Sequence, residues 1–488
     1  MKKLIVFIIT ALFLDTAVPV LAAGDKAMSD GDTLMFDFGE TAEDGWIQVT
    51  DGTKYKKDTG YGFSMVSYVE NTDASGGGVL SDAVKIDYLN ADRVSFDVDV
   101  PPGVYEVSVY SGDIQYMTAA LEGEPAILDM QGSCTEGRAE IAVTDGQLNI
   151  SFMQSISGTE LAVSAICVTR KSGPEERKKR VFVCGDSLAA TYYPLFVTDP
   201  SDESMRGGWG QLLENFLPDD LYVHNLSSPG QTAKGFVEKG LLDGVLKFSE
   251  PGDHVIVSFG YNDHLTCTSE EYSAYMTEIL DAVTEKGCSV IVCSEPAETD
   301  EFSDNGTYTA ANNRYEAEAK AAAEAAGAAY IDLHAAYAKY LCDIGKNAAE
   351  SLFHIMWNNT RDELHTNRKG AGQAARILVE ECVKNGIADF EGKVWADGGI
   401  SQSSALKCRI DGNKVYILNT SPSETDMSIV TNTYNESGVL SGTKTVYAKL
   451  PEYDVFSPND EIELTIPVQD ESSRSFIIGG GIDIRLVP

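Results

Sequence analysis

Between residues 30 and 170, apolar and polar positions alternate over short runs, with Gly, Pro, Asp and Asn between the runs. The segments Val94–Val98 and Val104–Val107 are clear examples. This alternation places one face of a strand in a core and the other face in water. Many short strands in succession, without a convincing helical period, predict an N-terminal β-sandwich of the jelly-roll kind over residues 30–170.

The pattern changes after a polar and basic stretch, KSGPEERKKR, at residues 171–180. A basic stretch can bind a polyanion, but this one is short and contains Gly, Pro and two acids. These features favour a solvated linker between two domains.

Residues 181–388 alternate near-continuous apolar runs with helical patterns. The apolar runs are typical of parallel strands that are buried on both faces. The clearest helical pattern opens with a capping box at Thr268 and Glu271 and closes at Gly287, and Ala310–Ala326 predicts a second helix rich in alanine. The alternation predicts a doubly wound α/β sandwich, in which ligands bind beyond the carboxyl ends of the strands.

Short strand-like runs return beyond Phe390. They predict a small C-terminal β-domain over residues 391–488.

The first residues of the chain have the pattern of a secretory signal peptide over residues 1–22. Lys2 and Lys3 precede the apolar run Leu4–Leu14, and small residues near the end suit cleavage after Ala22. An uncleaved membrane anchor is the alternative, but the apolar run is too short to span a bilayer comfortably. We therefore expect a secreted, extracellular protein, either free or associated with the cell surface, that has no membrane contact after cleavage.

Charge and cysteine content narrow the choice of partners. The chain has 37 Lys and Arg against 75 Asp and Glu, a net charge of −38, which disfavours binding to nucleic acid and anionic membranes.

Nine cysteines leave at least one unpaired within the chain, and no CxxC or HExxH spacing occurs. Cys184, Cys288 and Cys293 stand in apolar runs and are expected to be buried. No metal or other cofactor is expected, and the oligomeric state is left open.

A candidate nucleophile, Ser187, directly follows a predicted buried strand. It is either a reactive serine at the rim of the sheet or a helix cap. A reactive serine needs a base and a group that orients the base. His365 has an acid, Asp362, three residues before it, in a spacing that lets the carboxylate bond one ring nitrogen in a loop or helical turn. His264 and His354 are rivals without an acid at this spacing.

Donors for an oxyanion are expected at other strand ends. Asn262 follows one predicted strand and offers a side-chain amide, and Gly230 follows another and offers a backbone N–H. With the N–H of Ser187 they would form an oxyanion hole of three donors. Asp186 and Asp263, next to these residues in the chain, are expected to support the site from behind.

These motifs, in this order, resemble the SGNH or GDSL-type hydrolase family over residues 181–386. Ser187, Gly230, Asn262 and His365 match its four named residues, and Asp362 matches its triad acid. The resemblance implies a flavodoxin-like three-layer α/β/α fold and a metal-independent esterase or lipase.

Two further patterns are similar to the rhamnogalacturonan acetylesterase branch of that family. One is Gly208–Gln211, and the other is the pair Phe36–Gly39 and Gly60–Phe63, which resembles a galactose-binding-like front domain. The chain departs from that branch at Gly230, which follows a proline rather than a glycine, and at Glu295–Glu301, an acidic segment after a strand where the branch is commonly basic.

We therefore expect a carbohydrate esterase with a Ser-His-Asp triad that removes O-acetyl groups from a plant cell-wall polysaccharide, most simply rhamnogalacturonan in pectin. The alternatives are a deacetylase of a neutral glycan such as acetylxylan, a GDSL-type lipase or thioesterase, and a glycan-binding protein whose hydrolase scaffold is inactive. The expected partner is the acetylated polysaccharide itself.

Overall fold

The structure is a computed structural model. It describes residues 28–87, 91, 94–154, 160–172, 178–192, 205–299, 314–356, 358–395, 404–455, 458, 461–466, 472–479 and 482–486. The described chain forms two compact units, one up to residue 172 and one from residue 178 onward. The expected signal peptide, residues 1–22, lies outside the described residues. No helix in the described ranges is long and apolar enough to cross a membrane.

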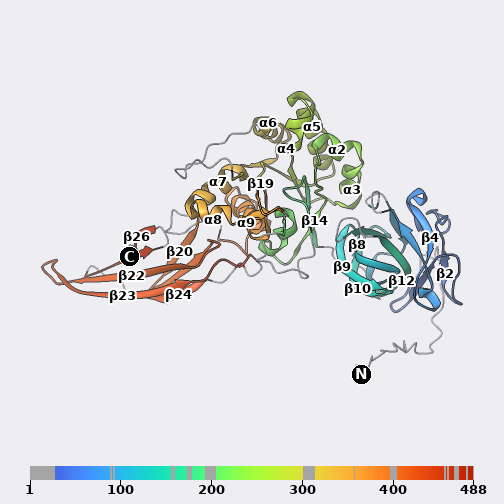
Figure 1. The fold of residues 1–488 in the computed structure, drawn as a ribbon, viewed down its shortest axis with the longest axis horizontal. Coiled ribbons are helices and arrows are strands. Elements are labelled where there is room, and N and C mark those ends of the chain that lie inside the picture. Colours follow the sequence, from blue (N-terminus) through green and yellow to red (C-terminus); the bar gives the residue numbers. More distant parts are fainter. Residues whose placement is uncertain are drawn as a thin grey trace, which may run out of the picture. The chain divides into compact units, whose positions relative to one another are not determined.

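The first unit is a β-sandwich, as the alternating pattern predicts (Figure 1). Its larger sheet contains β1 (Thr33–Phe38), β2 (Ile47–Val49), β4 (Val69–Asp73), β5 (Asp82–Ile86), β7 (Gly103–Ser111), β10 (Glu136–Val143) and β12 (Leu161–Ser172). The second sheet has the order β3 (Tyr61–Phe63), β6 (Ser95–Asp99), β11 (Gln147–Gln154), β8 (Asp113–Leu121) and β9 (Glu124–Ser133). Single 3₁₀ turns, Val66–Tyr68 and Gly78–Leu80, interrupt the strands.

The core of this unit lies between the two sheets. Phe36 and Phe38 of β1 contact Phe96 of β6 edge to face, with ring centroids 5.1 and 5.0 Å apart. The pattern of one buried and one wetter face therefore produces two sheets that share a single aromatic core.

The second unit is built on a parallel sheet with the order β14 (Leu221–Asn225), β13 (Lys179–Gly185), β15 (His254–Ser258), β16 (Ser289–Cys293) and β17 (Ala329–Ile331). In chain order this is 2-1-3-4-5, the flavodoxin-like arrangement. The expected α/β fold is confirmed.

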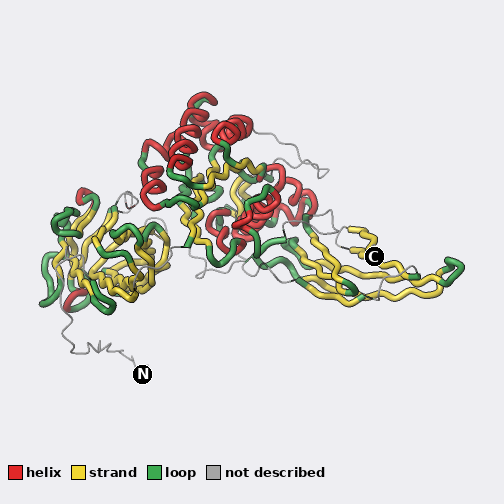
Figure 2. Tube along the Cα trace, turned by 180° about the vertical axis from the view of Figure 1, so that it is seen from behind, coloured by secondary structure: helices red, strands yellow, loops and turns green. Residues whose placement is uncertain are grey.

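Helices cover both faces of this sheet (Figure 2). Successive residues of β13 point to opposite faces, so that Val181 packs with one helical layer and Phe182 with the other. The first layer contains α1 (Trp209–Leu212), α7 (Leu333–Ile344) and α9 (Arg368–Lys384). The second contains α2 (Ala233–Glu238), α3 (Leu241–Phe248), α5 (Ser269–Glu285) and α6 (Glu316–Ala326).

The short elements complete the hydrolase part. They are the 3₁₀ turns Leu213–Phe216 and Ala388–Phe390, the helices α4 (Tyr261–Thr266) and α8 (Lys346–Glu350), and the two-stranded sheet of β18 (Phe353–Ile355) and β19 (Arg361–Thr366).

The predicted helix boundaries are partly right. The capping box of α5 is present, with Thr268 accepting from the backbone of Glu271 and the Glu271 side chain accepting in return. The alanine-rich helix is shorter than predicted, because Tyr315 has a left-handed φ of 58° and α6 begins at Glu316. Residues 310–313 lie outside the described residues.

The C-terminal part consists of two sheets. One has the order β20 (Leu406–Asp411), β21 (Lys414–Asn419) and β24 (Ile462–Thr465). The other has the order β23 (Leu440–Leu450), β22 (Thr425–Tyr434), β25 (Ser473–Gly479) and β26 (Ile482–Leu486). These further β-sheets are the ones that the sequence predicts. The predicted domain boundary between residues 388 and 391 stays a prediction, since both parts belong to one compact unit.

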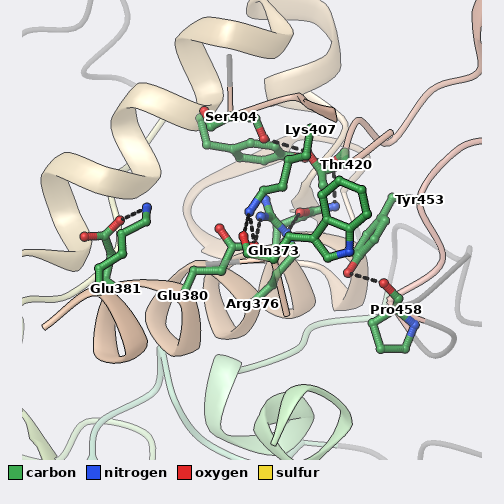
Figure 3. Close-up of polar contacts among 12 residues, drawn as sticks. Gln373, Arg376, Glu380, Glu381, Ser404, Lys407, Thr420, Tyr453 and Pro458 are labelled. Carbon is green, nitrogen blue, oxygen red and sulfur yellow. Dashed lines mark hydrogen bonds and ion pairs between the residues drawn. The ribbon is translucent and has the colours of Figure 1, made fainter. Parts of the chain in front are cut away.

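A buried ionic cluster joins the C-terminal sheets to α9. Figure 3 shows Lys407 of β20 and Arg376 of α9 pointing toward Glu380, and both nitrogen-to-oxygen distances are 2.6 Å. Tyr340 and Gln373 donate to the backbone oxygen of Thr420 beside this cluster. Removing one member of such a buried cluster leaves an uncompensated buried charge, which is strongly unfavourable.

Candidate functional site

Ser187 lies in a tight turn directly after β13, at the carboxyl edge of the sheet. The turn is held by Asp186, whose Oδ1 accepts from the backbone N–H of Leu188 at 2.8 Å. The Ser187 side chain is 7% exposed. The first described helix after it begins at Trp209, so Ser187 does not cap a helix in the described chain. Of the two roles left open by the sequence, the structure does not support that of a helix cap.

His365 and Asp362 extend a hydrogen-bonded chain from Ser187. His365 Nε2 lies 3.0 Å from Ser187 Oγ, and His365 Nδ1 lies 3.0 Å from Asp362 Oδ2. The other carboxylate oxygen, Asp362 Oδ1, accepts from the backbone N–H groups of Leu364 and His365, both at 3.0 Å. The histidine hydrogen-bonded to Ser187 is therefore His365, and not His264 or His354.

The local structure around this pair differs from the expected loop or helical turn. Asp362 and His365 both lie on β19, where an offset of three residues would normally send side chains to opposite faces. They meet because the Asp362 side chain folds back onto the two following N–H groups and because the pairing of β18 with β19 is irregular.

The electrostatic state of Asp362 suits the orientation of a histidine. Burial raises the pKa of Asp362, but the hydrogen bonds from His365 and from the backbone outweigh burial and hold the pKa below the ordinary value. Asp362 is therefore ionised at neutral pH, and its Oδ2 accepts the Nδ1 proton of a neutral or charged imidazole.

Arg206 was not found by the sequence reasoning. Its guanidinium lies 3.3 Å from Asp362 Oδ2 and 5.4 Å from the ring centroid of Tyr192, whose hydroxyl donates to the Ser187 backbone oxygen. The Arg206 side chain is 30% exposed, so a cation stands beside the hydrogen-bonded chain and reaches solvent. No spacing rule links Arg206 to Asp362, which lies 156 residues later.

Asn262 and Gly230 are brought to the same edge of the sheet. Asn262 is the second residue of α4, after β15, and its Nδ2 donates to Asp186 Oδ2 at 2.7 Å and to the Gln231 backbone oxygen at 3.1 Å. Gly230 has a left-handed φ of 74° in the turn after β14. That turn is tied to the end of β13, because the Ser228 N–H donates to the Gly185 oxygen. Asn262 is therefore bonded to the turn that carries Ser187 through Asp186, and Gly230 lies two residues after Ser228, which is bonded to the end of β13.

The two acids expected behind the site are buried. Asp186 is 1% exposed, and burial raises its pKa. Burial also raises the pKa of Asp263 to about 7, and its Oδ1 accepts from the backbone N–H of Ala233 at 2.9 Å. Asp263 therefore ties α4 to α2 and does not contact Ser187.

In the described part of the acidic segment, Glu295 and Glu298 do not form the exposed acidic rim that the sequence suggests. Glu295 is 3% exposed and accepts from the backbone N–H of Tyr261, and Glu298 is 5% exposed and pairs with Arg314. The physical reason is tertiary, since Arg314 and the Tyr261 backbone draw both carboxyls inward. Residues 300 and 301 lie outside the described residues.

Within the described ranges there is no group of three or more His, Cys, Asp or Glu residues that could hold a metal ion. The nine cysteines are free thiols, and Cys184, Cys288 and Cys293 are buried as expected.

Two family models match this chain. Residues 34–169 match a family model described as Beta-agarase/YXIM esterase-like, galactose-binding domain-like, and residues 183–372 match the GDSL-like Lipase/Acylhydrolase family. The uncharacterized esterase YxiM of Bacillus subtilis is 34% identical over 361 residues, which are 73% of this chain and 92% of YxiM. The crystal structure of that protein superposes with a TM-score of 0.57 at 33% identity, covering 74% of this chain and all of the other.

The names of two more distant relatives include a substrate. The rhamnogalacturonan acetylesterase RhgT of Bacillus subtilis is 25% identical over 221 residues, covering 43% of this chain and 91% of RhgT. The probable rhamnogalacturonan acetylesterase YesY of the same organism is 26% identical over 214 residues, covering 42% of this chain and 94% of YesY. The chain belongs to the GDSL-like lipase and acylhydrolase family, with a galactose-binding-like domain in front of its hydrolase domain.

Proposed function

We propose that the protein is a secreted serine esterase that removes O-acetyl groups from a plant cell-wall polysaccharide, rhamnogalacturonan in pectin. The observation that carries the proposal is the continuous hydrogen-bonded chain from Asp362 through His365 to Ser187. This is the arrangement in which a serine becomes a nucleophile at neutral pH.

In the proposed reaction, Ser187 Oγ attacks the ester carbonyl while His365 Nε2 takes the hydroxyl proton. The same proton then passes to the departing sugar oxygen, which leaves Ser187 acetylated. Water replaces the sugar, gives a proton to His365 and attacks the acetyl carbonyl, and acetate leaves as Ser187 regains its proton. Asp362 keeps the imidazole in the required tautomer and stabilises its charged form.

The negative charge that develops on the carbonyl oxygen needs donors. The backbone N–H groups of Ser187 and Gly230 and the Asn262 amide are proposed for this role. Within the described residues no acceptor for the Gly230 N–H is found. The two N–H groups of the Asn262 amide donate to Asp186 and to the Gln231 backbone oxygen, so the longer of these bonds, to Gln231, is proposed to be exchanged for the oxyanion when it forms.

The choice of an acetylated pectin is supported by the relatives named rhamnogalacturonan acetylesterases. It is also supported by the burial of Glu295 and Glu298, which removes two charges that would repel a polyanion. Arg206, partly exposed beside Asp362, supplies a cation near the reacting groups.

Acetate release across acetylated pectins, xylans and mannans tests the proposal. Release from rhamnogalacturonan ahead of the others is expected. Release from acetylxylan alone would replace the named substrate with a neutral glycan, and preference for long-chain esters would indicate a lipase. If no acid is released from any ester, the remaining alternative is a glycan-binding protein with an inactive hydrolase scaffold.

Asn262→Ala should lower kcat by about 10²- to 10³-fold with little change in KM, because an oxyanion donor acts mainly in the transition state. Steady-state kinetics on a short-chain aryl acetate measure the effect, with Asn385→Ala at the far end of α9 as a control of the same residue type. A change confined to KM would instead assign Asn262 to substrate binding.

Salt should affect the polymeric substrate selectively. The net charge of −38 repels a polyanion, and the Debye length shrinks from about 30 Å at 0.01 M to about 10 Å at 0.1 M ionic strength. KM for acetylated pectin is therefore expected to fall as salt rises, while KM for a neutral aryl acetate stays constant. A KM for pectin that rises with salt would show that local cations, with Arg206 as the first candidate, dominate binding.

A further inference from the structure

Two buried carboxyl groups meet behind Ser187. Asp186 follows β13 and Glu295 lies just beyond β16, so the two flank the end of β15, which lies between these strands in the sheet. Asp186 is 1% exposed and Glu295 is 3% exposed, and the two carboxyls accept from consecutive residues, Asn262 and Tyr261. Glu295 is not part of the hydrogen-bonded chain from Asp362 to Ser187.

Both carboxyls hold the segment that leaves β15. Asp186 Oδ2 accepts from the Asn262 side chain at 2.7 Å, and Glu295 Oε2 accepts from the Tyr261 backbone at 2.9 Å. The same segment is packed tightly, since a Cβ on Gly260 would lie 2.3 Å from the Arg314 backbone oxygen. The position of the Asn262 amide therefore depends on two carboxyl groups that come from different strands.

Two ionised carboxylates buried close together repel each other, and burial raises the pKa of both, so we infer that the pair holds a proton. Asp186 accepts two N–H donors, from Leu188 and Asn262, whereas Glu295 accepts one from Tyr261. Hydrogen bonds from N–H donors favour the charged form, which places the charge on Asp186 and the proton on Glu295. Glu295 Oε1 is buried and receives no N–H or O–H donor in the described chain, as a protonated oxygen should.

The surrounding charges agree with this assignment. Burial and then the charge of Asp186 raise the pKa of Glu295 well above its ordinary value, against the lowering effect of Arg314. Arg314 has Glu298 as its ion-pair partner. Burial raises the pKa of Asp186, and His365 from β19 opposes that effect. The other titratable neighbours of the pair are Asp263 on α4, Tyr272 on α5, Cys293 on β16 and Tyr192 after the Ser187 turn.

We propose that Glu295 is a positioning residue, protonated in the active protein, that donates to Asp186 and thereby fixes Asn262 at the edge of the site. This inference rests on the proposed function in one respect, because it assumes that the Asn262 amide stabilises the oxyanion. The pair itself is a property of the fold.

The comparison of Glu295→Gln with Glu295→Ala tests the positioning role. Glutamine can donate to Asp186 and accept from the Tyr261 N–H, so its kcat should stay within about 3-fold of wild type because both hydrogen bonds survive. Alanine removes both, and kcat should fall by about 10²-fold with KM little changed, as for a displaced oxyanion donor. A glutamine variant as inactive as the alanine variant, or an alanine variant as active as wild type, would overturn the proposal.

Infrared spectroscopy tests the protonation directly and does not depend on turnover or on the alanine variant folding. At about pH 8, far above the ordinary carboxyl pKa of about 4, the spectrum of the wild type minus that of Glu295→Gln should contain the C=O band of a protonated carboxylic acid. Glu298→Gln is the matched control, because Glu298 is equally buried but paired with Arg314, and its difference spectrum should lack that band. Absence of the band in the Glu295→Gln difference would overturn the proposal. If Ser187→Ala keeps esterase activity while the band is present, the proposed function fails and the carboxyl pair stands.

Discussion

Ser187→Ala is expected to lower kcat on a short-chain aryl acetate by about 10⁴- to 10⁶-fold, because the proposed nucleophile is lost and the rest of the hydrogen-bonded chain has nothing to activate. Folding should be nearly unchanged, since the Oγ contact given up is a single hydrogen bond to His365, a loss of about 1 kcal/mol. Initial rates together with a thermal unfolding curve measure both quantities.

Ser227→Ala is the matched control for this variant. Ser227 lies at the end of the neighbouring strand β14, and its hydroxyl contacts the Val183 backbone oxygen rather than His365. It should keep its activity within a few-fold of wild type. If Ser187→Ala itself stays within about tenfold of wild type, Ser187 is a turn residue and the proposed nucleophile is wrong.

His365→Ala should cost nearly as much as the loss of the serine, because the members of a triad act as a unit. For the same reason the double variant Ser187→Ala/His365→Ala should be no slower than either single variant, which is the non-additivity expected of coupled residues. The same assay with matched His264→Ala and His354→Ala variants completes the test. A crippling loss in either of these, with His365→Ala active, would show that the base has been misassigned.

Most of the fold could be predicted from sequence periodicity. Alternation of apolar and polar residues with a period of two predicts the N-terminal sandwich. Continuous apolar runs, such as the one that ends at Gly185, predict the parallel sheet. Because parallel strands place their carboxyl ends on one edge, the residues after those strands could be grouped before any geometry was available. Ser187, Asn262 and Gly230 were found in this way.

The arrangement of charges could not be predicted in the same way. The sequence predicts that Glu295 and Glu298 form an acidic surface, because a sequence shows which residues are charged but not which groups they contact. In the structure, Arg314 pairs with Glu298 and the Tyr261 backbone donates to Glu295, and both carboxyls are buried. Arg206 was missed because its contact with Asp362 joins segments that no pattern connects.

Details of the local backbone conformation could not be predicted from the sequence either. The meeting of Asp362 and His365 on an irregular strand, rather than in a loop, depends on side-chain hydrogen bonds to the backbone. The start of α6 depends on one left-handed residue, Tyr315. The C-terminal sheets contact α9 through the pairing of Lys407 on β20 with Glu380 on α9, and no local pattern connects these two elements. Each of these is a tertiary effect that overrides a local preference.

The most direct test of the central claim, that Ser187 is the nucleophile, is covalent labelling with a fluorophosphonate followed by mass spectrometry of the peptides. The proposed mechanism predicts a single adduct on the peptide that contains Ser187, and the loss of that adduct in His365→Ala, which lacks the base. An adduct on another residue would contradict the mechanism. Loss of ester hydrolysis after treatment while Ser187 stays unlabelled would contradict it as well.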